Sequence, residues 1–236
     1  MTKTRGRFSR KPGNGKPNRN RISNPLTARG RSRRKKRSRK PLLALALLAF
    51  LLVGFLVLGS ILHARVMAVR RDRAVEPSLQ VLQQTRVTKE EQMRFARAVA
   101  GSSVSRGLNP AVVAAIIVVE SGGNPMTVSP TGDLGLMQVN VRVHAKTFDF
   151  QNRNLLNPEE NIEVGTSILE IMLKRHGEAK AIAAYNGLLP EKQAYSGRVQ
   201  TVLETAGIPP EWRSVAISGT SLELWSDWWT AARTFF

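Results

Sequence analysis

The residues from Leu42 to Leu62, LLALALLAFLLVGFLVLGSIL, contain no charged side chain. Because a helix rises about 1.5 Å per residue, a segment of this length spans the roughly 30 Å hydrocarbon core of a bilayer. The sequence therefore predicts one transmembrane helix over residues 41–62. The alternative is a signal peptide cleaved near Val66–Ala68, but the apolar part of a signal peptide is usually only about 7–15 residues long.

The chain has 36 Lys and Arg against 17 Asp and Glu, and the excess is concentrated at one end. Residues 1–40 hold 17 of the basic residues and none of the acidic ones, so we expect a basic, disordered tail. The block RRKKRSRK, Arg33–Lys40, adjoins the apolar segment, and the positive-inside rule keeps such a block in the cytoplasm. These features predict a single-pass inner-membrane protein with a cytoplasmic N-terminus and a periplasmic remainder.

The charge of the basic tail suits an anionic partner, and its position beside the apolar segment favours the anionic lipids of the cytoplasmic leaflet. Nucleic acid is the less favoured partner, because the tail lacks the interleaved aromatic residues that stack on bases. The sequence has no cysteine, which excludes disulfides and zinc–thiolate sites. Its three histidines, His63, His144 and His176, are scattered, so we expect neither a metal site nor a cofactor.

Residues 63–87 form a polar stretch that we interpret as a linker, and the helical pattern begins after it. Thr88-Lys-Glu-Glu91 is a capping box that predicts a helix to about Ala100, closed by Gly101. Asn109-Pro110 and Asn157-Pro158 each combine an N-cap with a proline at the first helical position. The predicted helices cover about residues 88–100, 109–120, 157–177, 179–187 and 190–206.

These helices predict a domain over residues 88–207 that is mostly α, with one small irregular hairpin within MTVSPTGDLGLMQV, 126–139. The fold class is therefore α+β with few strands. The C-terminal segment, 208–236, is rich in aromatic residues such as Trp225 and Trp228. We interpret it as docking on the domain, with the membrane interface or a partner as alternatives.

Glu120 comes directly after the apolar run VVAAIIVV, Val112–Val119. A helix that is apolar almost all round is typical of a buried helix, so its last residue is expected beside whatever the next loop covers. Desolvation by Ile116 and Ile117 would raise the pKa of this carboxyl and make it a candidate general acid. The alternative is a glutamate that leaves the core at a helix end and points into water.

The residues that follow Glu120 resemble the first motif of the lytic transglycosylases with a lysozyme-like catalytic domain of the soluble lytic transglycosylase (SLT) type. Three further motifs follow in the same order, so the resemblance covers about residues 91–204. It implies a lysozyme-like helical domain behind the transmembrane helix. The matching residues are Glu120, Ser121, Asn124, Pro125, Ser129, Gly132 and Gly135–Val139 in the first motif, then Asn161, Ile162 and Gly165, then Ala184–Gly187, then Tyr195 and Val199.

By this resemblance the substrate is a peptidoglycan glycan strand, and Glu120 is the single catalytic acid/base. It would protonate the oxygen between N-acetylmuramic acid (MurNAc) and N-acetylglucosamine (GlcNAc), then deprotonate the 6-hydroxyl that closes a 1,6-anhydro ring. The resemblance also implies roles for five other residues. Ser129 and Gln138 would bind sugar, Met137 would line the cleft, Tyr185 would be the partner of Glu120, and Asn186 would hold the cleft wall or the sugar.

Three residues depart from the family pattern. Asp133 stands where a small residue is usual, Gly123 where an aromatic is frequent, and Val141 where a proline is frequent. We interpret Asp133 as a loop residue, but across the cleft it could hold a water and favour hydrolysis. A lysozyme-like hydrolase and a non-catalytic peptidoglycan-binding scaffold therefore remain as alternatives, and the sequence indicates no protein partner.

Overall fold

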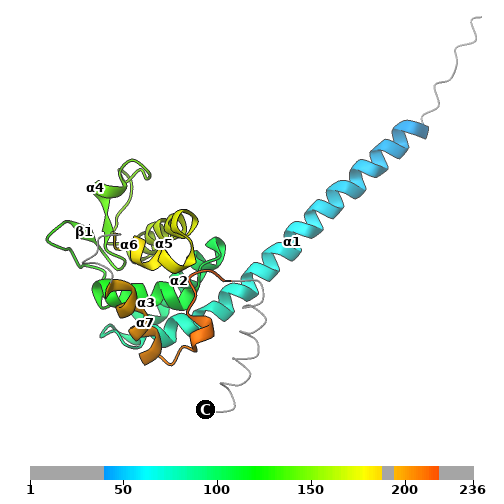
Figure 1. The fold of residues 1–236 in the computed structure, drawn as a ribbon. Helices are drawn as coiled ribbons and strands as arrows, with labels where there is room; N and C mark the ends of the chain where they lie inside the picture. Colours follow the sequence, from blue (N-terminus) through cyan, green and yellow to red (C-terminus); the bar gives the residue numbers. More distant parts are fainter. Residues whose placement is uncertain (1–39, 188–193, 218–236) are drawn as a thin grey trace, which may run out of the picture. The chain divides into compact units, whose positions relative to one another are not determined.

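The computed structural model describes residues 40–187 and 194–217 (Figure 1). The expected basic tail up to residue 39 and the aromatic part of the C-terminal segment, 218–236, lie outside the described residues. The described part of the chain is mostly helical with one small sheet, which confirms the predicted fold class. The elements are α1 (Lys40–Leu82), α2 (Lys89–Arg106), α3 (Pro110–Ser121), β1 (Asp133–Leu134), β2 (Val139–Asn140), α4 (Val141–His144), α5 (Pro158–His176), α6 (Glu178–Tyr185), α7 (Ala194–Thr205) and a 3₁₀ helix (Pro210–Trp212).

α1 contains the predicted membrane segment. From Leu45 onward the helix is long and apolar enough to cross a membrane, as judged by its length and composition. Its most apolar window has a mean hydropathy of 2.8 and no buried residue. The large apolar side chains from Phe50 to Leu62 are each more than half exposed.

Residues 63–82, which the sequence analysis places in a linker, are helical and end inside the domain. Val81 and Leu82 are fully buried in the main core. Gln80 donates a 2.6 Å hydrogen bond from Nε2 to the carbonyl of Ala206, just after α7. The difference from a linker has a physical cause, because these contacts join residues more than a hundred positions apart, and local polarity does not reveal them.

α2 is longer than the sequence predicts. Its capping box at Thr88 is confirmed, because the side chains and backbone of Thr88 and Glu91 bond each other reciprocally. The helix passes through Gly101 and ends at Gly107, which takes the left-handed conformation with φ of 67°. Contacts of α2 with α3 and α5 hold the extra turns.

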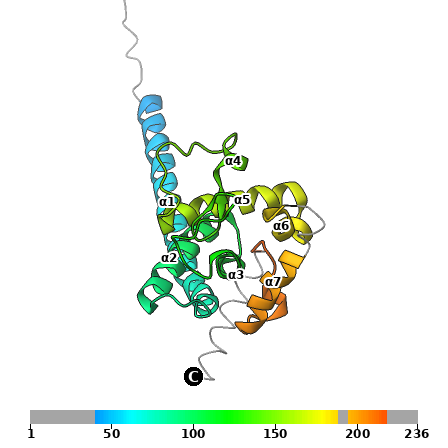
Figure 2. The same ribbon diagram turned by 90° about the vertical axis from the view of Figure 1, so that its left-hand side faces the viewer.

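α3 is the buried helix expected before Glu120. Its residues from Pro110 to Ile117 are all buried, and it contacts α2 and α7 (Figures 1 and 2). Asn109 caps it by accepting a hydrogen bond from the Ala111 N–H at 3.0 Å. Burial of each large aliphatic side chain contributes about 1.5–3 kcal/mol to stability. The buried part of α3 therefore fixes the position of the last turn of the helix, which contains Glu120.

The predicted hairpin is confirmed, and α5 holds it in place. β1 and β2 are antiparallel, with Asp133 opposite Asn140. The buried Asn161 of α5 donates hydrogen bonds to the carbonyls of Leu134 and Leu155 at 2.7 and 2.9 Å. The second motif of the sequence therefore supports the loop formed by the first.

Candidate active site

Glu120 lies in the last turn of α3, where the buried helix reaches the surface. Its side chain is partly exposed, and the helix closes at Gly122 with φ of 61°. The hydroxyl group of Tyr195, from α7, donates a 2.7 Å hydrogen bond to Oε1 of Glu120. The buried helix α3 therefore fixes the backbone of Glu120, and the hydrogen bond from Tyr195 fixes its carboxyl group.

Two tyrosines, Tyr185 and Tyr195, lie close to Glu120, and both keep their protons. Burial and then the charge of Glu120 raise the pKa of Tyr195 well above its usual value, and the hydrogen bond to Glu120 adds to this. The pKa of Tyr185 is raised well above its usual value by burial, followed by the charges of Glu120 and Asp133. Both phenols therefore act as hydrogen-bond donors at any physiological pH.

A cavity of about 480 Å³ opens beside Glu120. It brings together Ser129, Gln138, Tyr185 and Asn186 with Glu120, from four separate parts of the sequence. Apolar side chains from α5, Ile168 and Met172, form another part of its lining. The remaining residues that line it are Thr131, Asp133, Val139, Asn140, Val143, His144, Ala184 and Gly187.

Met137 is not part of this lining, although the sequence analysis expects it there. Its side chain is fully buried. Its backbone N–H donates to Oδ1 of Asn161 at 2.7 Å, and its carbonyl accepts a 2.8 Å hydrogen bond from the hydroxyl of Tyr185. Met137 therefore anchors the loop beneath the cavity, because a buried apolar side chain is more stable in the core than at a polar surface.

The hydroxyl of Tyr185, the expected partner of Glu120, donates its hydrogen bond to the carbonyl of Met137, and Tyr185 interacts with Glu120 through the charge of that carboxyl group. The hydrogen bond that reaches Glu120 comes from Tyr195. The sequence offers a signal for this, since Tyr195 belongs to the fourth motif and a buried tyrosine needs a partner for its hydroxyl. Motif order alone does not show which of two tyrosines turns toward the acid.

Gln138 has a backbone conformation that non-glycine residues seldom adopt, with φ of 48°. Its side-chain Nε2 donates to the carbonyls of Thr127 and Gly135 at 3.1 and 2.9 Å. The left-handed conformation costs about 1–3 kcal/mol and persists only where the surroundings impose it. Asn161 and Tyr185 impose it here by holding the preceding residue, Met137, at both its N–H and its carbonyl.

Ser129 lies before β1, next to Asp133, and lines the same cavity. Its Oγ donates a 2.6 Å hydrogen bond to Oδ2 of Asp133 and accepts one from the Asp133 N–H at 2.9 Å. Asp133 itself is in β1 and lines the same cavity as Glu120. Two carboxyl groups therefore border the cavity.

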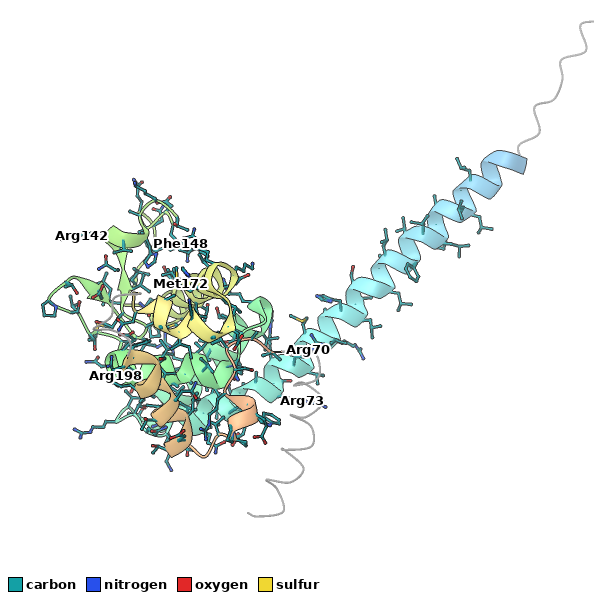
Figure 3. The ribbon with its side chains drawn as sticks, viewed as in Figure 1. Arg70, Arg73, Arg142, Phe148, Met172 and Arg198 are labelled. Atoms are coloured by element: carbon teal, nitrogen blue, oxygen red, sulfur yellow. The ribbon has the colours of Figure 1, made fainter. Side chains whose placement is uncertain are left out.

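Sequence reasoning assigned no role to His144 and Asn140. His144 is the last residue of α4, Asn140 is the N-cap of that helix, and both line the cavity. Burial lowers the pKa of His144, which keeps its imidazole neutral at neutral pH. Phe148 and Met172 pack against a small apolar cluster that contains Val139 (Figure 3). These residues carry no motif, so only their position in space identifies them.

Comparison with known proteins identifies the domain. Residues 98–203 match the family model "Transglycosylase SLT domain". Endo-type membrane-bound lytic murein transglycosylase A of Cronobacter sakazakii is 38% identical over 98 residues, which cover 38% of this chain and 45% of the relative. The protein of the same name from Citrobacter koseri is 37% identical over 84 residues, 32% of this chain and 40% of the relative.

A third similar protein is the transglycosylase of Enterobacteria phage PRD1, 36% identical over 90 residues, 38% of this chain and 33% of the relative. The chain thus spans less than half the length of these curated relatives. The matched region contains Glu120, the hairpin, Asn161 and both tyrosines. Residues 98–203, which include all the residues that line the cavity beside Glu120, are therefore the part of the chain that is similar to a transglycosylase SLT domain.

Proposed function

We propose that the chain is a lytic transglycosylase that cleaves the β-1,4 bond between MurNAc and GlcNAc in peptidoglycan, with Glu120 as its single acid/base. The observation that carries the proposal is the position of Glu120, which ends a buried helix, accepts a hydrogen bond from Tyr195 and lines a polar cavity. The SLT domain and the name lytic murein transglycosylase of two similar proteins support the same activity.

The reaction needs one carboxyl group that changes its protonation state twice. Protonated Glu120 gives its proton to the glycosidic oxygen while the bond from that oxygen to C1 of MurNAc breaks. The Glu120 carboxylate then takes the proton of the 6-hydroxyl of the same MurNAc, and O6 bonds to C1. The products are a GlcNAc-terminated strand and a 1,6-anhydroMurNAc end, with no water consumed and Glu120 protonated again.

The residues around the cavity have properties that suit a glycan strand. Gln138, Ser129 and Asn186 offer amide and hydroxyl groups, which bind sugar hydroxyl and N-acetyl groups. Ile168 and Met172 (Figure 3) offer apolar surface for the faces of the sugar rings. Tyr195 keeps the Glu120 carboxyl oriented toward the bond that breaks.

The apolar part of α1 supports a membrane anchor for this enzyme. It is long enough to cross a bilayer, and the names of two similar proteins include the term membrane-bound. Residues 63–73, on its C-terminal side, contain four arginines, whereas the block Arg33–Lys40 has seven basic residues in eight and follows further basic residues in the tail. The greater positive charge at the N-terminal side favours a cytoplasmic N-terminus and a periplasmic domain.

The test is mass spectrometry of peptidoglycan digested with the full chain in detergent and with its Glu120→Gln variant. We expect muropeptides that end in 1,6-anhydroMurNAc, one water lighter than hydrolytic products, and a rate about 10²- to 10⁴-fold lower for the variant. A Glu163→Gln variant is the matched control, because it removes an exposed carboxylate of α5 that bonds only weakly to Arg153, at 3.4 Å.

Asp133 makes a hydrolase the second candidate, because a hydrolytic mechanism uses two carboxyl groups across the bond. Reducing-end products in the same digest would favour it. If neither protein released products and both bound peptidoglycan, the chain would be a binding protein and the proposal would be wrong.

A further inference from the structure

Asp133 is the carboxyl group of the cavity whose role the proposed reaction leaves open. Its side chain accepts three hydrogen bonds, each of 2.6 Å. Oδ2 accepts from the hydroxyls of Ser129 and Thr131, and Oδ1 accepts from Nδ2 of Asn140. All four residues line the cavity, so the network forms part of its wall.

The three donors come from two separate segments on either side of Asp133. Ser129 and Thr131 belong to the turn before β1, and Asn140 stands at the junction of β2 and α4. Oδ1 of Asn140 accepts a 3.0 Å hydrogen bond from the Val143 N–H, so the same side chain caps α4. Through Asn140, the Asp133 carboxylate is connected to the short helix that carries Val143 into the cavity lining.

A base that activates water must direct an oxygen at that water from about 2.6–3.2 Å. A carboxylate offers about four acceptor sites, and three donors of the surrounding wall already bond to Asp133. Charge-assisted hydrogen bonds of this length are roughly twice as strong as neutral ones. These hydrogen bonds therefore fix the orientation of the Asp133 carboxylate toward the residues of the cavity wall.

We propose that Asp133 is a positioning residue, which joins the 129–131 turn, the hairpin and α4 into one substrate-binding wall and does not activate water. The inference rests on the proposed function and makes it more specific. With no second base at C1, the nucleophile is the 6-hydroxyl of the substrate, so the product carries a 1,6-anhydro ring.

The experiment is a double-mutant cycle in the full chain with Asp133→Ala, Asn140→Ala and the double variant. KM, kcat and the ratio of anhydro to reducing ends are measured on purified peptidoglycan, and affinity for sacculi is measured separately because it needs no turnover. We expect Asn140→Ala to raise KM about fivefold, the size of effect that loss of one net hydrogen bond produces, and Asp133→Ala to raise KM further, because its carboxylate accepts three hydrogen bonds. The double variant should be no worse than the more severe single one, since both changes break the same connection.

Asp133→Asn and Thr131→Val act as milder variants in case an alanine variant unfolds. The asparagine keeps one acceptor oxygen, and Thr131 is exposed, so both should raise KM less than Asp133→Ala while the products stay anhydro. A loss of about a hundredfold in kcat for Asp133→Asn, or a fall in reducing ends that Asn140→Ala does not share, would identify Asp133 as a base and overturn the inference.

Effects of Asp133 and Asn140 that simply add, in KM and in sacculus affinity, would overturn it as well. Failure of the unmodified chain to release any muropeptide would contradict the proposed function instead. In that case coupling in sacculus affinity would still support the positioning role, and additive effects or loss of all binding would contradict it.

Discussion

The hydroxyl of Tyr195 donates a 2.7 Å hydrogen bond to Oε1 of Glu120 and so connects α7 to the last turn of α3. The two residues are 75 positions apart in the sequence. The ring of Tyr195 is buried, and the guanidinium carbon of Arg198 lies 5.3 Å from its centroid. The catalytic carboxyl group of the proposed reaction is thus oriented by a helix that does not contain it.

Removal of that hydroxyl should slow the chemical step. A hydrogen bond to a charged group contributes about 1.5–3 kcal/mol, so we expect Tyr195→Phe to lower kcat about 10- to 150-fold. The phenyl ring still fills the core, so the melting temperature should change little. Steady-state kinetics on purified peptidoglycan, with a thermal melt of the same sample, measures both. A variant with unaltered kcat would show that the hydrogen bond does not orient Glu120 during catalysis.

The ionisation of tyrosine gives a direct test of the site, because the chain has only two tyrosines and both lie beside Glu120. The pKa of each is raised in the folded protein, so the folded state holds these protons more tightly than the unfolded one. The resulting stabilisation is complete below about pH 10, the usual tyrosine pKa, and is lost as the pH rises above it.

We therefore expect no phenolate absorbance at 295 nm at pH 10 in the folded chain, and about half of the full signal in denaturant at that pH. Tyr185→Phe and Tyr195→Phe variants assign the two groups. Titration of either tyrosine near pH 10 in the folded protein would contradict its burial beside Glu120.

Local sequence signals predicted the elements that depend on neighbouring residues. The caps at Thr88, Asn109 and Asn157 are present, because an N-cap bonds to a backbone N–H two or three residues away. The role of Tyr195 and the burial of Met137 could not be predicted in this way. The first depends on how α7 meets α3 and the second on how α5 and α6 meet the loop around Met137, and their contacts cross 24 to 75 positions of sequence.

Asn161 should be one of the most important residues for stability. It is fully buried, and Asn161→Ala would remove hydrogen bonds to Met137, Leu134 and Leu155 and leave two buried backbone groups and a partly buried one without that partner. We expect a loss of about 2–4 kcal/mol in the free energy of unfolding. Chemical denaturation followed by circular dichroism would measure this loss. The control is Glu163→Ala at an exposed position, which should change the free energy of unfolding by less than about 0.5 kcal/mol. Equal effects of the two changes would mean that the hairpin does not depend on α5.

Two glycines in helices should respond in opposite directions to alanine. A Cβ on Gly165 would lie 2.5 Å from Sδ and 2.8 Å from Cβ of Met137, whereas a Cβ on Gly197 in α7 would meet nothing within 4 Å. Gly165→Ala should therefore destabilise the protein by about 1–3 kcal/mol and lower activity, because Met137 precedes Gln138. Gly197→Ala should stabilise it by up to about 1 kcal/mol, the difference in helix propensity. Thermal melts of the two variants compare these effects. Similar decreases in melting temperature for both variants would indicate that the contact with Met137 is unimportant.

Substitutions at the C-terminal end of α1 should destabilise the domain, whereas substitutions in the apolar segment of the same helix should not. Leu82 is fully buried, whereas the side chain of Leu62 is 63% exposed on the same helix. We expect Leu82→Ala to cost about 2–5 kcal/mol, through lost burial and the cavity that it leaves. Leu62→Ala should leave the melting temperature of the domain in detergent unaltered, because no described residue packs on it. If Leu82→Ala did not lower the melting temperature either, residues 63–87 would be the linker that their polarity indicates, and the burial of Val81 and Leu82 would contribute no stability.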